Sequence, residues 1–229
     1  MKAAFLILSA VNQHPTDTTN TLAQLQHQLK TLSHRFEQSP NALIEYSETA
    51  LSEEQKQQLL PHTDLLAEFR PNDLLIKLKA ERQATDNPIN STSYHELLKI
   101  VALNWFLQNA HGSGLFKDIN YVIVIESGTN MNLDFIEFLN KPEKIKGKFF
   151  FKKALPNPAQ SDKSHALMHY PTDLWAYSAG LTDELIDNII DASENAYNQL
   201  ADINTDNGPV GLGYELFKTI NLSKVHFLI

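Results

Sequence analysis

The feature that most constrains the fold of this sequence is a set of short apolar runs separated by longer segments of helical periodicity. Residues 3–11 and 121–125 are almost continuously apolar, whereas a strand with one face in water alternates apolar and polar residues. Such continuous runs indicate strands buried on both faces, as in the middle of a parallel sheet. Between them, residues 19–36 and 93–110 place apolar side chains three and four positions apart, which is typical of amphipathic helices. The sequence therefore predicts an α/β fold.

Weaker patterns add further elements in the same alternating order. In the first half we expect a second strand at 42–46, a helix opened by the capping box of Ser52 and Gln55, and a third strand at 73–78. In the second half we expect a basic and aromatic strand at 148–153, a helix from Thr182 to about Leu200, and a last apolar run at 225–229. This order predicts one domain with a mixed, mostly parallel sheet wound by right-handed crossovers and flanked by helices.

Composition excludes several classes of function. The chain has 229 residues, of which 42% are hydrophobic, so it can bury an ordinary globular core. Its 19 basic and 27 acidic residues give a net charge of -8, which disfavours nucleic acid as a partner. The absence of cysteine excludes disulfides, thiolate metal sites and cysteine nucleophiles.

The placement of the protein in the cell follows from its apolar segments. No stretch approaches the roughly 20 apolar residues that span a bilayer, so we expect no transmembrane segment. The opening run, MKAAFLILSAV, has the minimum shape of a signal peptide but is better explained as a first buried strand. We therefore expect a cytoplasmic protein, with peripheral contact at the inner face of the membrane left open.

Three stretches fall where predicted strands end, namely 9–13, 45–49 and 126–130. Because ligands of open α/β sheets bind at the carboxyl ends of the strands, these stretches are the first candidates for a binding site. The candidate substrate-binding residues from them are Ser9, Ala10, Glu48, Ser127 and Gly128.

Glu126 is the most informative of these positions, because it is an acid that directly follows the buried run YVIVI. Its carboxylate could coordinate a divalent ion or accept a hydrogen bond from a sugar hydroxyl. Alternatively it only marks the point where the strand leaves the core. Asp134 is expected to cap the following helix, FIEFL.

The second half offers further candidates, each with a structural alternative. In YPTDLWAYS, Trp175 and Tyr177 could stack on a sugar ring and Asp173 could accept from its hydroxyls, or the aromatic residues could belong to the core. His165 and His169 have a spacing that suits a metal, but the glutamate of a zincin motif is missing.

Two charged segments complete the candidates. Glu215, after a glycine-rich turn, could be a general base or could simply favour the start of a helix. Lys152 and Lys153 could pair with a diphosphate or protect an edge strand. The chain has no Gly-x-Ser-x-Gly elbow, and no dinucleotide fingerprint follows the first strand.

Several of these stretches, taken in order, resemble one family. They are KAAFLILSAV at the start, SYHELLKIVALNWFLQN followed by INYVIVIESGTNMNLDFIEFL in the middle, and YPTDLWAYS with GYELFKTINLSKVHFL near the end. In this order they resemble the GT-A type of nucleotide-sugar glycosyltransferases, in particular small bacterial enzymes of capsule and lipopolysaccharide synthesis. The resemblance covers most of the chain, although its individual motifs are loose.

The resemblance implies a GT-A/Rossmann-like fold and transfer of a sugar from a nucleotide-sugar donor to a saccharide acceptor in surface polysaccharide synthesis. Residues 1–140 would form the nucleotide-sugar-binding part and residues 141–229 the acceptor side. Glu126 matches the first acid of the family's acidic motif, and Asp134 and Phe135 match the pair that follows it.

The match at the acidic motif is incomplete, because Ser127 and Gly128 stand where its next two acids would be. A divalent cation, Mn²⁺ or Mg²⁺, held by Glu126 is therefore one option. Metal-independent transfer, with Lys152 and Lys153 in place of the cation, is the other. Glu215 would be the base.

Two other classes of function remain open on the sequence. One is a non-catalytic α/β protein that binds a nucleotide or a partner. The other is a glycoside hydrolase that uses Glu126 and Glu215, which would require the two carboxylates to face one cleft.

Overall fold

The computed structural model describes residues 2–13, 18–130, 135, 146–157, 168–202 and 209–228. Within these residues seven strands form the main sheet. Their spatial order is β3 (Leu65–Glu68), β2 (Asn41–Glu45), β1 (Ala3–Ser9), β4 (Tyr121–Glu126), β8 (Leu174–Ser178), β5 (Phe149–Phe151) and β9 (Val225–Phe227). A separate short pair joins β6 (Leu155–Pro156) to β7 (Met168–His169).

The main sheet is mixed but mostly parallel. Strands β3, β2, β1 and β4 are parallel neighbours, and β8 then runs antiparallel to both β4 and β5. Strand β9 is again parallel to β5. Parallel neighbours place their carboxyl ends at one edge of the sheet, which is where the predicted site lies.

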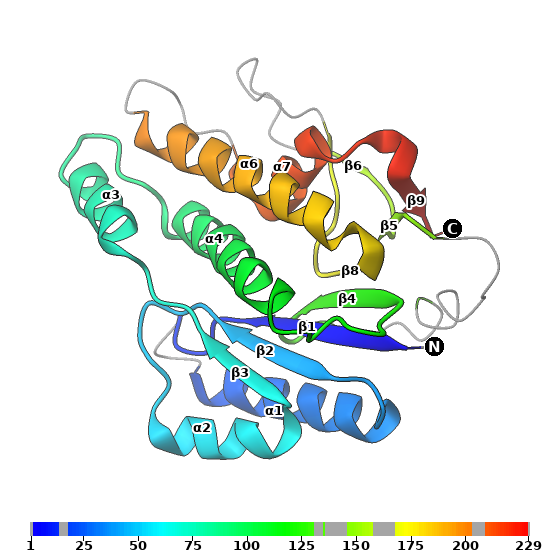
Figure 1. Ribbon diagram of the computed structural model, residues 1–229. Helices are drawn as coiled ribbons and strands as arrows, with labels where there is room; N and C mark the ends of the chain where they lie inside the picture. Colours follow the sequence, from blue (N-terminus) through cyan, green and yellow to red (C-terminus); the bar gives the residue numbers. More distant parts are fainter. Residues whose placement is uncertain are drawn as a thin grey trace.

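Helices cover both faces of the sheet (Figure 1). One face carries α1 (Thr18–Arg35) and α2 (Glu53–Leu59). The opposite face carries α3 (Asp73–Gln83), α4 (Ser91–His111), α6 (Thr182–Ala201) and α7 (Leu212–Thr219). Short 3₁₀ turns η1 (Leu60–His62), η2 (Ala179–Leu181) and η3 (Leu222–Lys224) connect elements.

The core has two layers, and the alternation of β1 separates them. Leu6 and Leu8 point into the layer shared with α4, α6 and α7, while Phe5 and Ile7 point into the layer shared with α1. All seven residues of β1 are buried, so the expected burial of this strand on both faces is confirmed. The four central residues of β4 are also buried.

Most predicted elements of the first half are confirmed, but the third strand is wrong. Residues 73–78 belong to helix α3, because Asn72 accepts a hydrogen bond from the backbone N–H of Leu75 and so caps a helix. The third strand is β3 instead, a short edge strand whose residues are only partly buried. Helix α4 begins slightly earlier than predicted, because the side chain of Asn90 accepts from the N–H of Ser93.

Other local predictions have different outcomes. The capping box of Ser52 and Gln55 is present at the start of α2. In the second half, the basic and aromatic strand predicted at 148–153 is shorter than expected, and β5 comprises only Phe149–Phe151. Asp134 and the helix FIEFL, apart from Phe135, lie outside the described residues. In the part of the chain that the structure describes, no helix combines the length and apolarity that crossing a bilayer requires.

Candidate functional site

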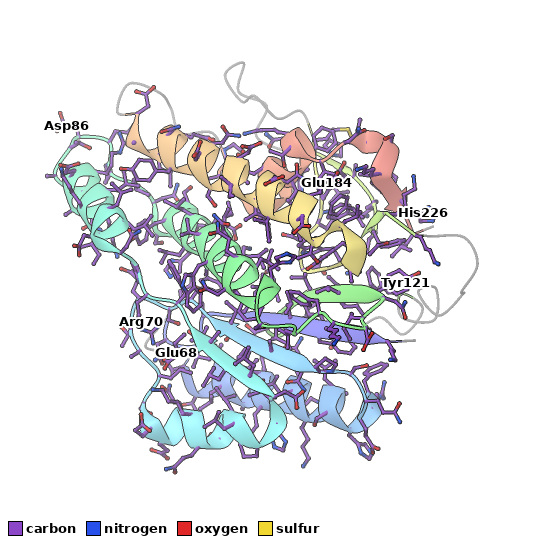
Figure 2. All side chains as sticks on the ribbon, in the orientation of Figure 1. Glu68, Arg70, Asp86, Tyr121, Glu184 and His226 are labelled. Atoms are coloured by element: carbon purple, nitrogen blue, oxygen red, sulfur yellow. The ribbon has the colours of Figure 1, made fainter. Side chains whose placement is uncertain are left out.

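The carboxyl edge of the sheet brings the three predicted stretches together. The register pairs Leu8 of β1 with Glu126 of β4, and Ser9 of β1 with Glu45 of β2. In Figure 2, Glu68 and Arg70 mark this edge at the end of β3, whereas Tyr121 marks the opposite, amino end of β4. The backbone N–H of Ser127 also donates to the carbonyl of Leu8 at 2.8 Å, which holds the end of β4 against β1.

The turn after β4 is tightly held. The N–H of Thr129 donates to the carbonyl of Glu126 at 3.1 Å, and Gly128 has a φ of 80°, as a type II turn requires at its third residue. Gln28 of α1 donates to the carbonyls of Glu126 and Thr129 at 3.2 and 3.3 Å, and it accepts from the N–H of Gly128 at 3.2 Å. The side chain of Gln28 therefore fixes both ends of the turn to α1.

The carboxylate of Glu126 points toward the α4 face of the sheet, where it meets Lys99. Its Oε1 atom lies 2.7 Å from Lys99 Nζ, and Nζ lies 2.6 Å from Glu96 Oε1. The Lys99 side chain is only 5% exposed, whereas that of Glu126 is 30% exposed. One buried ammonium thus bridges two carboxylates, and Glu126 remains reachable from solvent.

These neighbours set the protonation of the cluster. Burial would lower the pKa of Lys99, but the charges of Glu96 and Glu126 outweigh it and the pKa is raised. Burial raises the pKa of Glu126, and Lys99 opposes that shift. Lys99 is therefore a permanent cation, while Glu126 holds its proton more readily than an exposed glutamate.

Asp173 joins this site from the amino end of β8. Its carbonyl accepts from the N–H of Glu126 at 2.9 Å, and its carboxylate lies 2.7 Å from Lys152 Nζ. The structure therefore brings the candidates Glu126, Asp173 and Lys152 together, while Lys153 is exposed. Glu96 and Lys99 were missed, because their three-residue spacing in a helix reads as an ordinary surface pair.

The loops after β1 and β2 are organised by a second buried acid, Glu45. Its carboxylate accepts from the backbone N–H groups of Val11 and Ser47, both at 3.1 Å, and from the Ser47 hydroxyl. That hydroxyl in turn accepts from the N–H of Asn12 at 2.9 Å. Burial raises the pKa of Glu45 against these hydrogen bonds. The predicted Ser9 is fully buried beside this network and Ala10 is half-buried, while Glu48 pairs with Lys79 at 2.7 Å.

A groove of about 700 Å³ lies between α1 and α2, next to the loops that Glu45 organises. We call it the α1–α2 groove. Its polar lining includes Asn12, Thr19, Gln26, Thr49, Ser52 and Gln55. Among the described residues that line it, the polar groups are almost entirely amides and hydroxyls, and Glu54 is the only charged one. Such a surface suits an uncharged ligand rich in hydrogen-bonding groups. A second groove of about 600 Å³ runs along α1 and reaches Gly128 and Thr129.

Two predicted roles do not agree with where the structure places the residues: sugar stacking by Trp175 and Tyr177, and general-base catalysis by Glu215. Trp175 is fully buried and stacks on Phe151 with ring centroids 5.6 Å apart, and Tyr177 is also fully buried. These rings belong to the core, which was the alternative interpretation, and they do not offer a face to a sugar. The Glu215 side chain is likewise 0% exposed, and it is bonded to Lys218 at 2.6 Å.

The residues that the structure describes around Glu126 do not fit a divalent metal ion in this arrangement. Ser127 and Gly128 bring no carboxylate, and Glu126 Oε1 already faces an ammonium. Within the described ranges, no three histidine, aspartate or glutamate side chains are grouped to hold a metal. His169 packs against Tyr214, while its predicted partner His165 lies outside the described residues.

Comparison with known proteins supports the fold and no more. No family model matches this chain. No curated protein matches it either. Among solved structures, the mannosyltransferase Ktr4p from S. cerevisiae aligns with a TM-score of 0.53 and 12% identity, over 99% of this chain and 68% of its own.

Two other solved structures align less closely. Core-mannan synthase A from Aspergillus fumigatus, in an Mn/GDP form, has a TM-score of 0.47 at 12% identity, over 100% of this chain and 73% of its own. Mouse xyloside xylosyltransferase 1 has a TM-score of 0.49 at 15% identity, over 100% of this chain and 85% of its own. The predicted fold, one domain with a mixed, mostly parallel sheet of GT-A/Rossmann-like type flanked by helices, is confirmed.

Proposed function

We propose that this protein is a glycosyltransferase that moves a sugar from a nucleotide-sugar donor to a saccharide acceptor. The observation that carries the proposal is the partly exposed carboxylate of Glu126 at the carboxyl edge of a GT-A-like sheet, with Asp173 beside it. Binding at this edge is the general rule for open α/β sheets. The wider role in surface polysaccharide synthesis, and a cytoplasmic location, remain part of the proposal.

The two halves of the donor would occupy different parts of the edge. The α1–α2 groove suits the nucleoside, because its amide and hydroxyl groups match an uncharged base and ribose. The sugar would then lie toward Glu126 and Asp173, which can accept hydrogen bonds from its hydroxyls. Lys152, whose Nζ lies 2.7 Å from the Asp173 carboxylate, and its neighbour Lys153 would meet the phosphates.

The chemistry would rely on positioning and on one base. The bond between the anomeric carbon and the phosphate oxygen breaks, the acceptor oxygen forms the new bond to that carbon, and the acceptor proton passes to a carboxylate. We assign this role to Glu126 in place of Glu215, because Glu215 is fully buried and bonded to Lys218. The raised pKa of Glu126 suits a base, because it strengthens the hold on the proton.

Thermal unfolding with a panel of nucleotides tests donor binding. We expect at least one nucleotide or nucleotide-sugar at about 1 mM to raise the Tm by a few degrees, since ligands that bind only the folded state stabilise it. The Glu126→Gln variant should keep this shift but lose transfer by about 100-fold or more, as expected for loss of a general base. Glu37→Gln, a change at an exposed loop residue, is the matched control and should keep both.

The outcomes separate the remaining classes of function. A Tm that no nucleotide changes would count against the proposal. A non-catalytic nucleotide-binding protein would be favoured by two results together. The protein would bind a nucleotide without transferring sugar to any saccharide, and cells carrying Glu126→Gln would keep the biological phenotype of the wild type. We do not propose a two-carboxylate hydrolase, because the buried Glu215 is not open to a cleft that Glu126 could share.

A further inference from the structure

The cluster of Glu96, Lys99 and Glu126 has the charge arrangement of an occupied cation site. Lys99 Nζ lies 2.6 Å from one carboxylate and 2.7 Å from the other, and its side chain is only 5% exposed. An unpaired ammonium at this depth would be strongly destabilising, so Lys99 depends for its compensation on Glu96 and Glu126, whose side chains are partly exposed. Counted formally, two carboxylates and one ammonium leave the cluster with one negative charge.

The cluster is also fixed to several elements. Glu96 and Lys99 come from α4, and Glu126 ends β4. The other oxygen of Glu96, Oε2, accepts from the backbone N–H of Leu212 at the start of α7 at 3.3 Å. Because α4, β4 and α7 all hold these two carboxylates in place, the space between the carboxylates is preformed, and Lys99 fills it.

We propose that Lys99 is a built-in cation that takes the place of a divalent ion at the acidic turn, and that the site works without added metal. A metal would need Glu126 as a ligand, and Lys99 already occupies the bridging position between Glu126 and Glu96. The part of this inference that concerns turnover rests on the proposed transferase function. The part that concerns the cation can be tested on the folded protein alone.

Removal of the ammonium provides the test, because it should convert the cluster into a metal site. In Lys99→Ala, two carboxylates would face a small cavity, and such a pair can bind Mn²⁺ or Mg²⁺ with waters completing the coordination. We expect this variant to melt well below the wild type in EDTA and to recover about 2–4 °C or more in millimolar MnCl₂. The wild-type Tm should be the same in EDTA and in MnCl₂.

Two further variants control the experiment. Lys99→Ala combined with Glu126→Gln keeps only one carboxylate and should lose the response to MnCl₂. Lys56→Ala is the matched surface control, since Lys56 also bridges two acids, Glu53 at 3.3 Å and Glu68 at 2.9 Å, but Glu53 is 84% exposed. This variant should show no response to MnCl₂, because Glu53 is exposed and Glu68 keeps Arg70 as a cationic partner.

Each result has a defined meaning. A wild-type protein that binds Mn²⁺ in a manner lost on Glu126→Gln would overturn the inference, and this measurement does not depend on the stability of Lys99→Ala. A Lys99→Ala protein that folds but is not stabilised by MnCl₂ would also overturn it. Transfer activity that is present only with a divalent ion would refute metal independence, whereas failure to find any donor would count against the proposed function and leave the cation test unaffected.

Discussion

Glu45 is a fully buried carboxylate whose described hydrogen bonds come from neutral donors. Burial raises its pKa in the folded protein above the value of about 4.3 for an unfolded glutamate. The folded state therefore binds the proton more tightly than the unfolded state does. Consequently, the contribution of Glu45 to stability falls as the pH rises from the unfolded pKa through the folded pKa.

This shift gives a pH prediction for one residue. The unfolding free energy of the wild type minus that of Glu45→Gln should decrease as the pH rises from about 4 to about 8, by about 1.4 kcal/mol for each unit of pKa shift. Urea denaturation of both proteins across this range measures the difference. A difference that stays constant or increases with pH would contradict the assignment.

Some residues of the candidate site could be predicted from the sequence, and others could not. Glu126 and Asp173 were predicted because each stands next to a recognisable strand pattern. Lys99 was not, because nothing in SYHELLKIVAL distinguishes a lysine that faces the sheet from one that faces solvent. Only the register that sets Glu126 beside α4 gives Lys99 its second carboxylate, 27 residues away in the chain.

At the scale of single elements, α1 supports the site through one side chain. Gln28 bonds both ends of the turn after β4, whereas the side-chain amide of Gln24, one helical turn earlier, donates to Asn20 within α1. We therefore expect Gln28→Ala to loosen the turn that presents Glu126. Gln24→Ala serves as a control on the same helix.

The effect should appear locally before it appears globally. In Gln28→Ala, amide hydrogen exchange at Gly128 and Thr129 should become faster, with a loss of about 0.5–1.5 kcal/mol in stability because partly buried carbonyls lose a hydrogen-bond donor. Gln24→Ala should leave exchange at these amides unchanged. Equal exchange rates in both variants would show that Gln28 does not hold the turn.

The elements also explain which parts of the fold could be predicted. Strands β1 and β4 were found because continuous apolar runs leave little choice but a buried strand. The error at 73–78 came from reading LLIKL as a strand, since the apolar residues there do not show which face is buried. Strand β3 was missed because a four-residue edge strand with partly exposed side chains has almost no pattern of its own.

At the scale of the whole molecule, the two halves share one sheet, so the acceptor-side part proposed for residues 141–229 should not unfold separately. Strand β8 pairs with β4, and α6 and α7 pack in the same core layer as α4. We therefore expect a single cooperative unfolding transition. The two tryptophans report on opposite halves, Trp105 from α4 and Trp175 from β8.

Single-tryptophan variants test this cooperativity. In Trp105→Phe the fluorescence comes from β8, and in Trp175→Phe it comes from α4. For each variant the fluorescence midpoint should coincide with the midpoint of its own far-UV circular dichroism curve. If the fluorescence midpoint of the Trp105→Phe protein came before its circular dichroism midpoint, the second half would be an independent unit.

The position of β8 has a consequence for how the protein is made. Strands β3, β2, β1 and β4 can assemble once residue 126 has left the ribosome, but the neighbour of β4 is not synthesised until residues 174–178. During that interval β4 presents an unpaired edge, and the apolar layer above it lacks α6 and α7. A nascent chain of this length is therefore exposed to aggregation, and we expect it to depend on a chaperone that shields the open half-sheet until synthesis is complete.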